Sequence, residues 1–274
     1  MASVTTESLW YVYGIVPGAM SASSMPAGLD DAQVSLQQQD GVGALVSQLD
    51  ASVYGPDMLE TSSGDVEWLS PRAVAHDLVL TWASDRGAVI PLPMFSLFSS
   101  GNAVEKMLHE RAPALTATLA HVARGREYAL RVYRVDGELL RSVGALSPRL
   151  KEMSDAAAAA SPGQRYLLER KLDGEGKTEM RSVSAGIVEE IVAALSAASL
   201  EFVRSPIPRA AGTDAGGRGT MVLNAAFLVS PGALEGFQRT LATLVEKHAS
   251  HGFRFDFTGP WPPYHFVGEG GHGA

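Results

Sequence analysis

The chain has 274 residues, of which 46% are hydrophobic and 19% are charged. This composition is typical of a folded protein with one large domain or two of ordinary size, and it argues against a disordered chain. The absence of cysteine excludes disulfides, zinc–thiolate sites, iron–sulfur clusters and thiol nucleophiles. No apolar run approaches the roughly 18 residues that span a bilayer, so we expect no membrane association.

The formal charge of −8 is concentrated in the first quarter of the chain. Residues 1–71 hold nine acidic residues and no Lys or Arg, whereas the remainder holds 22 basic and 21 acidic residues. This balance disfavours binding to nucleic acid. Together with the absence of cysteine and of a membrane-spanning run, it leads us to expect a cytoplasmic protein. We expect the acidic region to face water or a basic partner, or to lie against the positive segment 111–181.

The first half of the chain predicts a small α+β domain. Aromatic and β-branched residues predict a strand, and Asp40-Gly41 between two apolar runs predicts a tight hairpin turn. The elements expected here are a buried strand at 9–16, a hairpin at 34–49, and loops at 18–33 and 50–64.

Two helices follow in this half. Ser70-Pro71 predicts the start of the first, with Val74, Leu78 and Trp82 as its buried stripe and Gly87 as its end. The apolar run 88–98 contains two prolines and is therefore not an ordinary central strand. Asn102 and Glu105 predict the capping pair of the second helix. Its expected apolar face is Val104, Leu108, Leu115, Leu119 and Val122.

The second half shows a more regular order. A strand at 128–135 precedes a helical region that opens at Ser147-Pro148 and breaks near 162–163. After a turn at 173–176 we expect a second helix, with Val183, Ile187, Ile191 and Leu195 on one stripe. The remaining expected elements are strands at 200–204 and 221–229, a helix from Ser230-Pro231, and a strand at 253–257. This order matches a split βαβ arrangement, so we predict a ferredoxin-like C-terminal domain with extra helices.

The predicted organisation is therefore α+β with two domains. We expect an N-terminal α+β domain at 1–125, a C-terminal ferredoxin-like domain with a helical insertion at 126–258, and an extension at 259–274. That extension begins with prolines and aromatic residues and ends in a Gly-rich tail that we expect to be disordered.

Motifs of enzyme chemistry are absent from the sequence. It contains neither G-x-S-x-G nor G-x-x-x-x-G-K-[ST], and the Gly-rich stretch 212–220 leads into a strand and lacks the lysine of a phosphate loop. His248 and His251 share a predicted helix face but lack a third ligand. We therefore expect no catalytic residue, no cofactor and no metal.

Two segments remain that ordinary folding does not explain. Residues 91–98 are apolar and bent by proline, and residues 258–267 are aromatic and rich in proline. Aromatic groups on a stiff backbone lose little entropy when they dock. Either the second segment packs back on the body and locks the two domains together, or the two segments form a docking surface for an apolar partner.

The same segments carry a resemblance that covers nearly the whole chain. The motifs are Tyr11-Val-Tyr-Gly-Ile-Val16, Trp68-Leu-Ser-Pro-Arg-Ala-Val-Ala-His76, Val89-Ile-Pro-Leu, Phe98-Ser-Ser, Gly163-Gln-Arg-Tyr-Leu167, Asn224-Ala-Ala-Phe-Leu-Val229 and Thr258-Gly-Pro-Trp-Pro-Pro-Tyr-His-Phe-Val267. Taken together they resemble the gas vesicle protein GvpF/GvpL family. The family pattern has Arg, Phe, Gly and Thr after its V-L-P, and residues 93–97 depart from it here.

The resemblance implies a non-enzymatic accessory protein of gas vesicle assembly, built from two α+β domains. Its implied partners are the hydrophobic shell subunit of the GvpA type and other accessory proteins, and its implied location is the cytoplasm, in association with gas vesicles. An apolar shell subunit requires an apolar groove with a charged rim. The candidate groove residues are Pro91, Met94, Phe95, Phe98, Trp261, Tyr264 and Phe266.

Three other functions remain to be considered. A ferredoxin-like domain is also a common small-molecule regulatory module, and the fold alone does not decide between the two. An RNA-binding module requires a basic face, which this acidic chain lacks. A hydrolase requires a nucleophile next to a base, and no such pair is visible.

Overall fold

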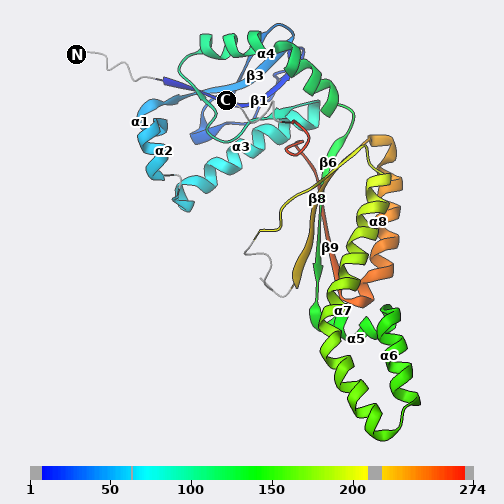
Figure 1. Cartoon of the computed structure of the whole chain (residues 1–274). Helices are drawn as coiled ribbons and strands as arrows, with labels where there is room; N and C mark the ends of the chain where they lie inside the picture. Colours follow the sequence, from blue (N-terminus) through cyan, green and yellow to red (C-terminus); the bar gives the residue numbers. More distant parts are fainter. Residues whose placement is uncertain (1–7, 63, 209–217, 269–274) are drawn as a thin grey trace, which may run out of the picture. The chain divides into compact units, whose positions relative to one another are not determined.

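The computed structural model describes residues 8–62, 64–208 and 218–268, and Figure 1 shows its course. The chain divides into two compact units. Unit 1 comprises residues 1–127 together with 261–274, and unit 2 comprises residues 128–260. The aromatic part of the C-terminal extension, from Trp261 onward, is thus a part of unit 1. The Gly-rich end 269–274 and most of the predicted loop 212–219 lie outside the described residues.

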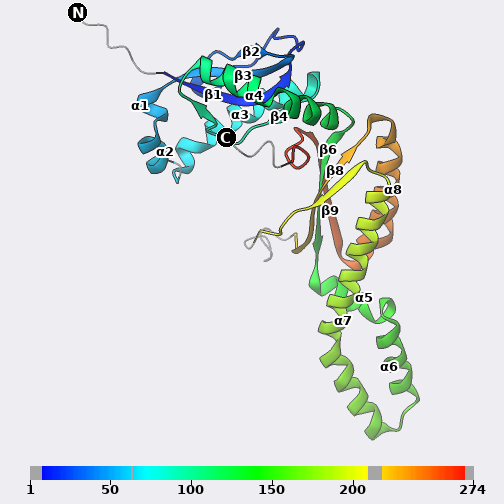
Figure 2. The same ribbon diagram turned by 45° about the horizontal axis from the view of Figure 1, so that its top comes forward.

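Unit 1 is built on an antiparallel sheet in the order β2-β3-β1-β4, and β5 also pairs with β1. Figure 2 shows β2, β3 and β1 side by side. The strands are β1 (Ser8–Pro17), β2 (Ser35–Gln39), β3 (Val42–Asp50), β4 (Ile90–Pro91) and β5 (Leu97–Phe98). The predicted hairpin is confirmed, with φ of 50° at Asp40 and 80° at Gly41, as a type I′ turn requires. The proline-containing run 88–98 forms only two-residue strands, as expected.

A bulge in β1 changes which side chains share a face of the sheet. The register of β1 against β3 shifts between Val12 and Gly14, so Tyr13 is the extra residue. Tyr11 and Tyr13 share a face by the two-residue period of a strand, and after the bulge Val16 joins them in the same core cluster. The next residue must be glycine, because a Cβ at Gly14 would lie 2.8 Å from both Leu80 Cδ2 and the Ile90 carbonyl oxygen.

Helices cover both faces of this sheet, with α3 on one side and α4 on the other (Figure 1). The helical elements of unit 1 are η1 (Leu29–Asp31), α1 (Ala51–Tyr54), α2 (Pro56–Ser62), α3 (Val66–Arg86) and α4 (Gly101–Val122). The predicted loop at 50–64 is wrong, because Asp50 accepts a hydrogen bond from Ser52 N–H at 2.8 Å and starts α1.

The predicted start of α3 is also wrong, and of its predicted buried stripe only Trp82 is buried. Asp65 caps this helix by accepting from the N–H groups of Glu67 and Trp68, so Pro71 lies inside it. Val74 is 60% exposed and Leu78 is 53% exposed. The face that packs on the sheet consists of His76, Val79, Leu80, Trp82 and Ala83. The C-terminal end at Gly87 is confirmed.

Helix α4 confirms its predicted apolar face but not its predicted cap. Val104, Leu108, Leu115, Leu119 and Val122 are all buried. The capping residue is Ser100, whose Oγ accepts from Ala103 N–H at 3.2 Å, and not Asn102.

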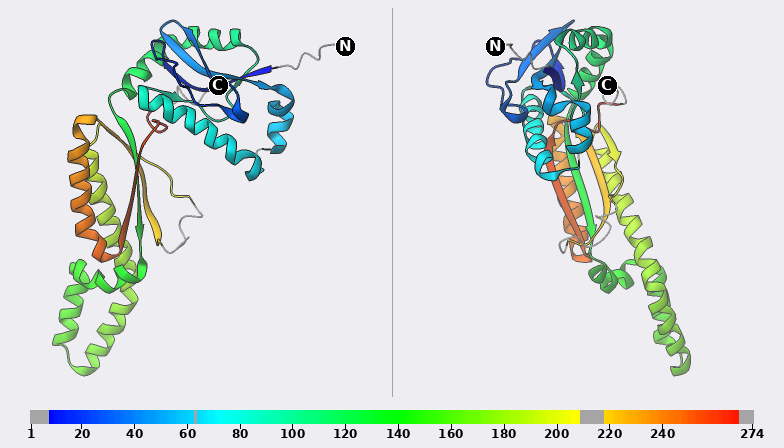
Figure 3. Two further views of the ribbon diagram at one scale, coloured as in Figure 1. Left: turned by 180° about the vertical axis from the view of Figure 1, so that it is seen from behind. Right: turned by 90° about the vertical axis from the view of Figure 1, so that its left-hand side faces the viewer.

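Unit 2 contains a four-stranded sheet in the order β7-β8-β6-β9 with helices packed against it. Figure 3 shows α7 and α8 on one face of this sheet. The strands are β6 (Arg126–Arg134), β7 (Glu201–Arg204), β8 (Thr220–Val229) and β9 (Phe253–Trp261). The helices are α5 (Asp136–Leu146), α6 (Pro148–Ala159), α7 (Pro162–Ala197), η3 (Pro231–Ala233), α8 (Leu234–His248) and η4 (Ala249–His251). The described residues of the chain are thus mixed α/β with antiparallel strand pairs.

Helix α7 differs from its prediction. It runs for 36 residues without the turn expected at 173–176, and α5 was not predicted. Glycine in a helix costs about 1 kcal/mol, which packing can offset. Gly176 is buried, and a Cβ there would lie 3.6 Å from Leu140 of α5. The start of α6 at Ser147-Pro148 is confirmed, since Ser147 Oγ accepts from Leu150 N–H at 3.1 Å.

The core of unit 2 is apolar and matches the predicted periodicity. Ile187, Ile191 and Leu195 of α7 are buried in one cluster with Phe237, Leu241 and Leu244 of α8. One face of β9 is aromatic: Phe257 stacks on Tyr128 with ring centroids 5.4 Å apart and on Phe237 at 5.8 Å. Across the described residues, no helix is both long enough and apolar enough to span a membrane.

Candidate functional site

The main candidate site is a groove of about 600 Å³ on unit 1. It lies between α3, the residues that follow β4, and the C-terminal segment that starts at Trp261. Four of the seven residues predicted from the sequence line it, namely Pro91, Met94, Trp261 and Tyr264. The other lining residues are Ala73, His76, Asp77, Leu92 and Pro93.

The other three predicted residues do not line the groove. Phe95 stacks on Trp68 with ring centroids 5.7 Å apart. Phe98 is partly buried in β5, where it pairs with Trp10 of β1. Phe266 of the C-terminal segment is buried. The structure therefore divides the predicted set into four residues that face the groove and three that pack elsewhere in unit 1.

Phe95 holds the chain in an unusual turn between β4 and β5. Its φ of 64° lies in the left-handed region, which bulky residues rarely adopt. Its N–H donates to the Tyr11 hydroxyl at 3.4 Å, and its ring packs against Trp68, Tyr11 and Tyr54. This arrangement fixes the position of the neighbouring Met94, which lines the groove.

A buried hydrogen-bond network forms the floor of the groove. Tyr11 Oη lies 2.6 Å from His76 Nδ1, and the backbone of Leu92 bonds to the same imidazole. Burial lowers the pKa of His76 to about 4 and raises the pKa of Tyr11. At neutral pH the imidazole is therefore uncharged, and the tyrosine hydroxyl donates to Nδ1. The network ties β1, α3 and the segment after β4 together.

The C-terminal segment is held in place by two carboxylates. Tyr264 Oη donates to Asp77 Oδ1 at 2.9 Å. Glu127 is only 2% exposed, and it accepts from His265 N–H at 2.9 Å and pairs with His265 Nδ1 at 2.7 Å. The hydrogen bond to Glu127 raises the pKa of His265. These contacts, together with the burial of Pro262 and Pro263, keep part of Trp261 and Tyr264 at the surface.

The outward face of α3 extends the apolar surface beside the groove. Val74 and Leu78 each follow a groove-lining residue, Ala73 and Asp77, by one position, and they are exposed. The sequence interpretation placed both in the core because they recur with Trp82 at four-residue spacing. The signal that could have corrected the start of the helix is Asp65, a capping residue with the acidic Glu67 in the first helical turn.

The charges around this surface are mostly acidic. Asp77 lines the groove, and Glu67 and Asp85 are exposed towards the two ends of α3. Arg72 is engaged in unit 1, where it pairs with Asp30 at 2.7 Å and covers the Trp68 ring at 4.1 Å. An apolar groove with an acidic rim suits an apolar segment that carries basic residues.

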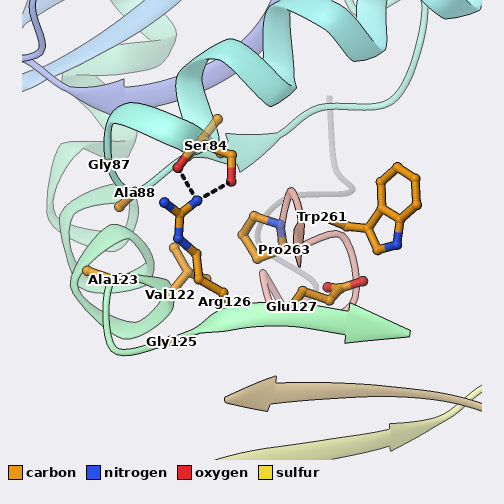
Figure 4. Close-up of a pocket in the computed structure, with 11 residues that line it drawn as sticks. Ser84, Gly87, Ala88, Val122, Ala123, Gly125, Arg126, Glu127, Trp261 and Pro263 are labelled. Carbon is orange, nitrogen blue, oxygen red and sulfur yellow. Dashed lines mark hydrogen bonds between the residues drawn. The ribbon is translucent and has the colours of Figure 1, made fainter. Parts of the chain in front are cut away.

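A second cavity of about 190 Å³ lies on the same unit beside Arg126, as Figure 4 shows. The guanidinium of Arg126 donates to the carbonyl oxygen and, at 3.2 Å, to the Oγ of Ser84. Ser84 lies in the last turn of α3, so Arg126 satisfies a carbonyl at a helix end. The cavity is smaller than the 300 Å³ or so that small-molecule sites usually have. This favours a structural role for the cavity beside Arg126.

Metal-binding geometry is not found within the residues that the structure describes, where no three His, Asp or Glu side chains converge. His248 is buried in α8, and its ring centroid lies 6.4 Å from that of His251. Burial lowers the pKa of His248, which leaves it uncharged at neutral pH.

The fold and the groove together define a class: two α/β units with antiparallel strand pairs, one of which carries an apolar groove with an acidic rim. The chain belongs to the gas vesicle synthesis protein GvpL/GvpF family, whose model matches residues 9–268. The resemblance stated from the sequence motifs is thereby confirmed.

Similar proteins agree with this assignment over nearly the whole length. Gas vesicle protein L1 of Halobacterium salinarum is 26% identical, over 94% of this chain and 89% of its own. Gas vesicle protein F of a Streptomyces species is 29% identical, over 94% of this chain and 98% of its own. The crystal structure of GvpF from Anabaena sp. PCC7120 has a TM-score of 0.70 at 19% identity, covering 95% of this chain and 98% of that one. That of GvpF from Microcystis aeruginosa has a TM-score of 0.65 at 18% identity, covering 96% and 99%.

Proposed function

We propose that this protein is a non-enzymatic accessory protein of gas vesicle assembly, which acts in the cytoplasm and binds the shell subunit of the GvpA type and other accessory proteins. The observation that carries the proposal is the groove of unit 1, where Met94, Trp261 and Tyr264 offer apolar surface next to the exposed Val74 and Leu78. Exposed apolar surface of this kind marks interaction sites in soluble proteins.

The physical role of the groove is to cover an apolar segment before it assembles. The two rings at its edge are rigid anchors, because Tyr264 is fixed by Asp77 and the segment by Glu127. Preformed aromatic anchors lose little conformational entropy on binding. The acidic rim disfavours an acidic partner and favours basic residues beside the apolar segment. The second unit fits a ferredoxin-like description, which the strand order β7-β8-β6-β9 supports.

Co-purification with a co-expressed shell subunit tests this proposal. Trp261→Ala and Leu78→Asp each remove apolar surface at the site, and we expect each to lower recovery of the subunit about tenfold, the effect of one interface anchor. The matched control is Ile207→Asp in unit 2, since Ile207 is 40% exposed and Trp261 is 39% exposed. Recovery with both groove variants equal to that of the control would refute the proposal.

Phe95→Ala is a poorer test of the groove, although Phe95 is one of the groove residues predicted from the sequence. Its ring packs against Trp68, Tyr54 and Tyr11, so its removal leaves a cavity and destabilises unit 1. Circular dichroism and the midpoint of urea unfolding of each groove variant should match those of the wild type, so that lost recovery reports lost binding.

A further inference from the structure

Helix α7 carries an exposed surface that the groove does not involve. Its C-terminal half packs on the sheet of unit 2, whereas its N-terminal half pairs with α6 in a hairpin that extends beyond the sheet (Figures 1 and 3). Tyr166 is 64% exposed and Leu167 is 66% exposed, which makes them two of the most exposed large hydrophobic residues described. Neither contributes to the core of its unit.

Basic side chains accompany these two residues. Arg170, Lys177 and Arg181 follow Tyr166 at intervals that keep one helix face, and all three are exposed; the acidic position on that face of the helix is 173. Residues 161–181 hold five basic and four acidic residues. Two of the four acids are engaged towards α6: Glu175 pairs with Arg149 at 2.7 Å, and Glu179 accepts from Ser147 Oγ at 2.8 Å. We call Tyr166, Leu167, Arg170, Lys177 and Arg181 the α7 tip.

The complementary surface lies on unit 1 of the same chain. In α2 and the first turn of α3, Met58 is 43% exposed and Val66 is 72% exposed. They are accompanied by Asp57, Glu60 and Glu67, which are exposed, and no Lys or Arg precedes Arg72 in the chain. We call Asp57, Met58, Glu60, Val66 and Glu67 the acidic corner.

We propose that the chain associates with itself head to tail, with the α7 tip of one copy docked on the acidic corner of a second copy. The tip is basic and the corner is acidic, so the two surfaces are complementary in charge. Each also presents exposed apolar side chains. A heterologous contact of this kind leaves a free tip and a free corner at the two ends of a dimer, so it continues into longer chains or closes into a ring. None of the corner residues lines the groove, and only Glu67 is shared with the acidic charges along α3 beside it, so the inference does not depend on the proposed function.

Sedimentation velocity of the purified full chain over a range of concentrations tests the inference. We expect the average mass to rise beyond that of a dimer at about 50 mM salt, and the association to weaken at about 500 mM, because salt screens exposed charge pairs. Three exposed charge pairs of ordinary strength correspond to roughly tenfold in the association constant. A chain that stays monomeric at both salt concentrations would overturn the inference.

Charge reversal distinguishes this contact from general aggregation. Arg170→Glu with Lys177→Glu reverses the tip, Asp57→Lys with Glu67→Lys reverses the corner, and we expect each double variant to lose self-association while its circular dichroism stays native. A mixture of the two should associate again, since each contact then joins opposite charges. Lys106→Glu with Arg239→Glu changes the net charge as the tip variant does and should associate like the wild type. A mixture that stays monomeric, or a control that also dissociates, would contradict head-to-tail docking.

Discussion

The cores of the two units differ in composition: one is apolar, and the other contains hydrogen-bonded polar side chains. In unit 2 the core is almost wholly aliphatic and phenylalanine, and regular helices supply it at regular spacing. In unit 1 the core includes Tyr11, Tyr13 and His76, whose polar atoms bond to one another, to Ser47 and to the backbone. This polar core holds the irregular chain at residues 88–98, because it bonds to the backbone of Leu92 and Phe95. Hydrogen bonds with fixed geometry specify such a path, which apolar contacts alone do not.

Charge and tryptophan content follow the same division. Unit 1 holds six Lys and Arg against fifteen Asp and Glu, whereas unit 2 holds sixteen against fifteen. All four tryptophans, Trp10, Trp68, Trp82 and Trp261, belong to unit 1. Tryptophan fluorescence therefore reports the unfolding of unit 1, and circular dichroism reports both units. This difference allows each prediction below to be assigned to one core.

The largest expected effect comes from the apolar core of unit 2. Phe237 is fully buried and contacts the rings of Phe227 and Phe257. Phe237→Ala should lower the free energy of unfolding by about 3–5 kcal/mol, the usual cost of such a cavity. In urea unfolding, the transition seen by circular dichroism should split or shift, while the fluorescence midpoint stays within error of the wild type. An equal shift of the fluorescence midpoint would show that the two cores unfold as one.

The buried imidazole of unit 1 should make that unit sensitive to acid. The pKa of His76 falls from 6.5 to about 4 on burial, so the unfolded chain takes up the proton first as pH falls. Stability is therefore lost as pH decreases from 6.5 towards 4, by roughly 3 kcal/mol in total. His76→Gln has no titrating group and should show a smaller loss. Urea unfolding followed by fluorescence at several pH values measures both, and parallel curves would contradict the assignment.

The same contrast explains which elements the sequence could predict. The hairpin at Asp40-Gly41 and the buried stripes of α4 and α7 follow from local turn chemistry and periodicity, and they are confirmed. The start of α3 could not be decided between Asp65 and Ser70, because both are good capping residues. The turn expected at 173–176 is overridden by packing of α7 against α5 and α6, which no local rule contains.

The candidate site was only partly predictable for a related reason. Composition identifies the segments 91–98 and 258–267 as unusual, but not which of their side chains face outward. The positive φ of Phe95 and the pairing of His265 with Glu127 decide that, and both depend on contacts between distant parts of the chain. His76 and Asp77 were missed because the stripe of Val74, Leu78 and Trp82 was taken as the buried face of α3, whereas Val74 and Leu78 are exposed.

A smaller effect is expected from the hydroxyl at the centre of the polar core. Tyr11→Phe leaves His76 Nδ1 and Phe95 N–H without their partner in a buried site. The cost of unsatisfied buried groups is about 1–3 kcal/mol. Tyr264→Phe is the matched control, since the hydroxyl it removes bonds to Asp77 in an exposed setting, where water replaces it. Fluorescence-detected urea unfolding should show a clear loss for the first variant and little for the second. Equal losses would mean that burial does not set the cost.

The smallest effect concerns the pair that holds the C-terminal segment on unit 1. The hydrogen bond to Glu127 raises the pKa of His265, so the pair stabilises the fold fully below the unfolded-state pKa near 6.5, and this stabilisation is lost as pH rises through the folded-state value. The His265 side chain is 41% exposed, and solvent screening keeps the contribution below about 1 kcal/mol. His265→Gln leaves the backbone N–H bond to Glu127 in place and removes only the titrating group. The difference in unfolding free energy between wild type and variant should be largest near pH 6 and should shrink towards about pH 9. In a Glu127→Gln background the same difference should no longer depend on pH, because the charge that raises the pKa is gone. A difference that grows with pH would mean that burial, and not Glu127, dominates the titration of His265.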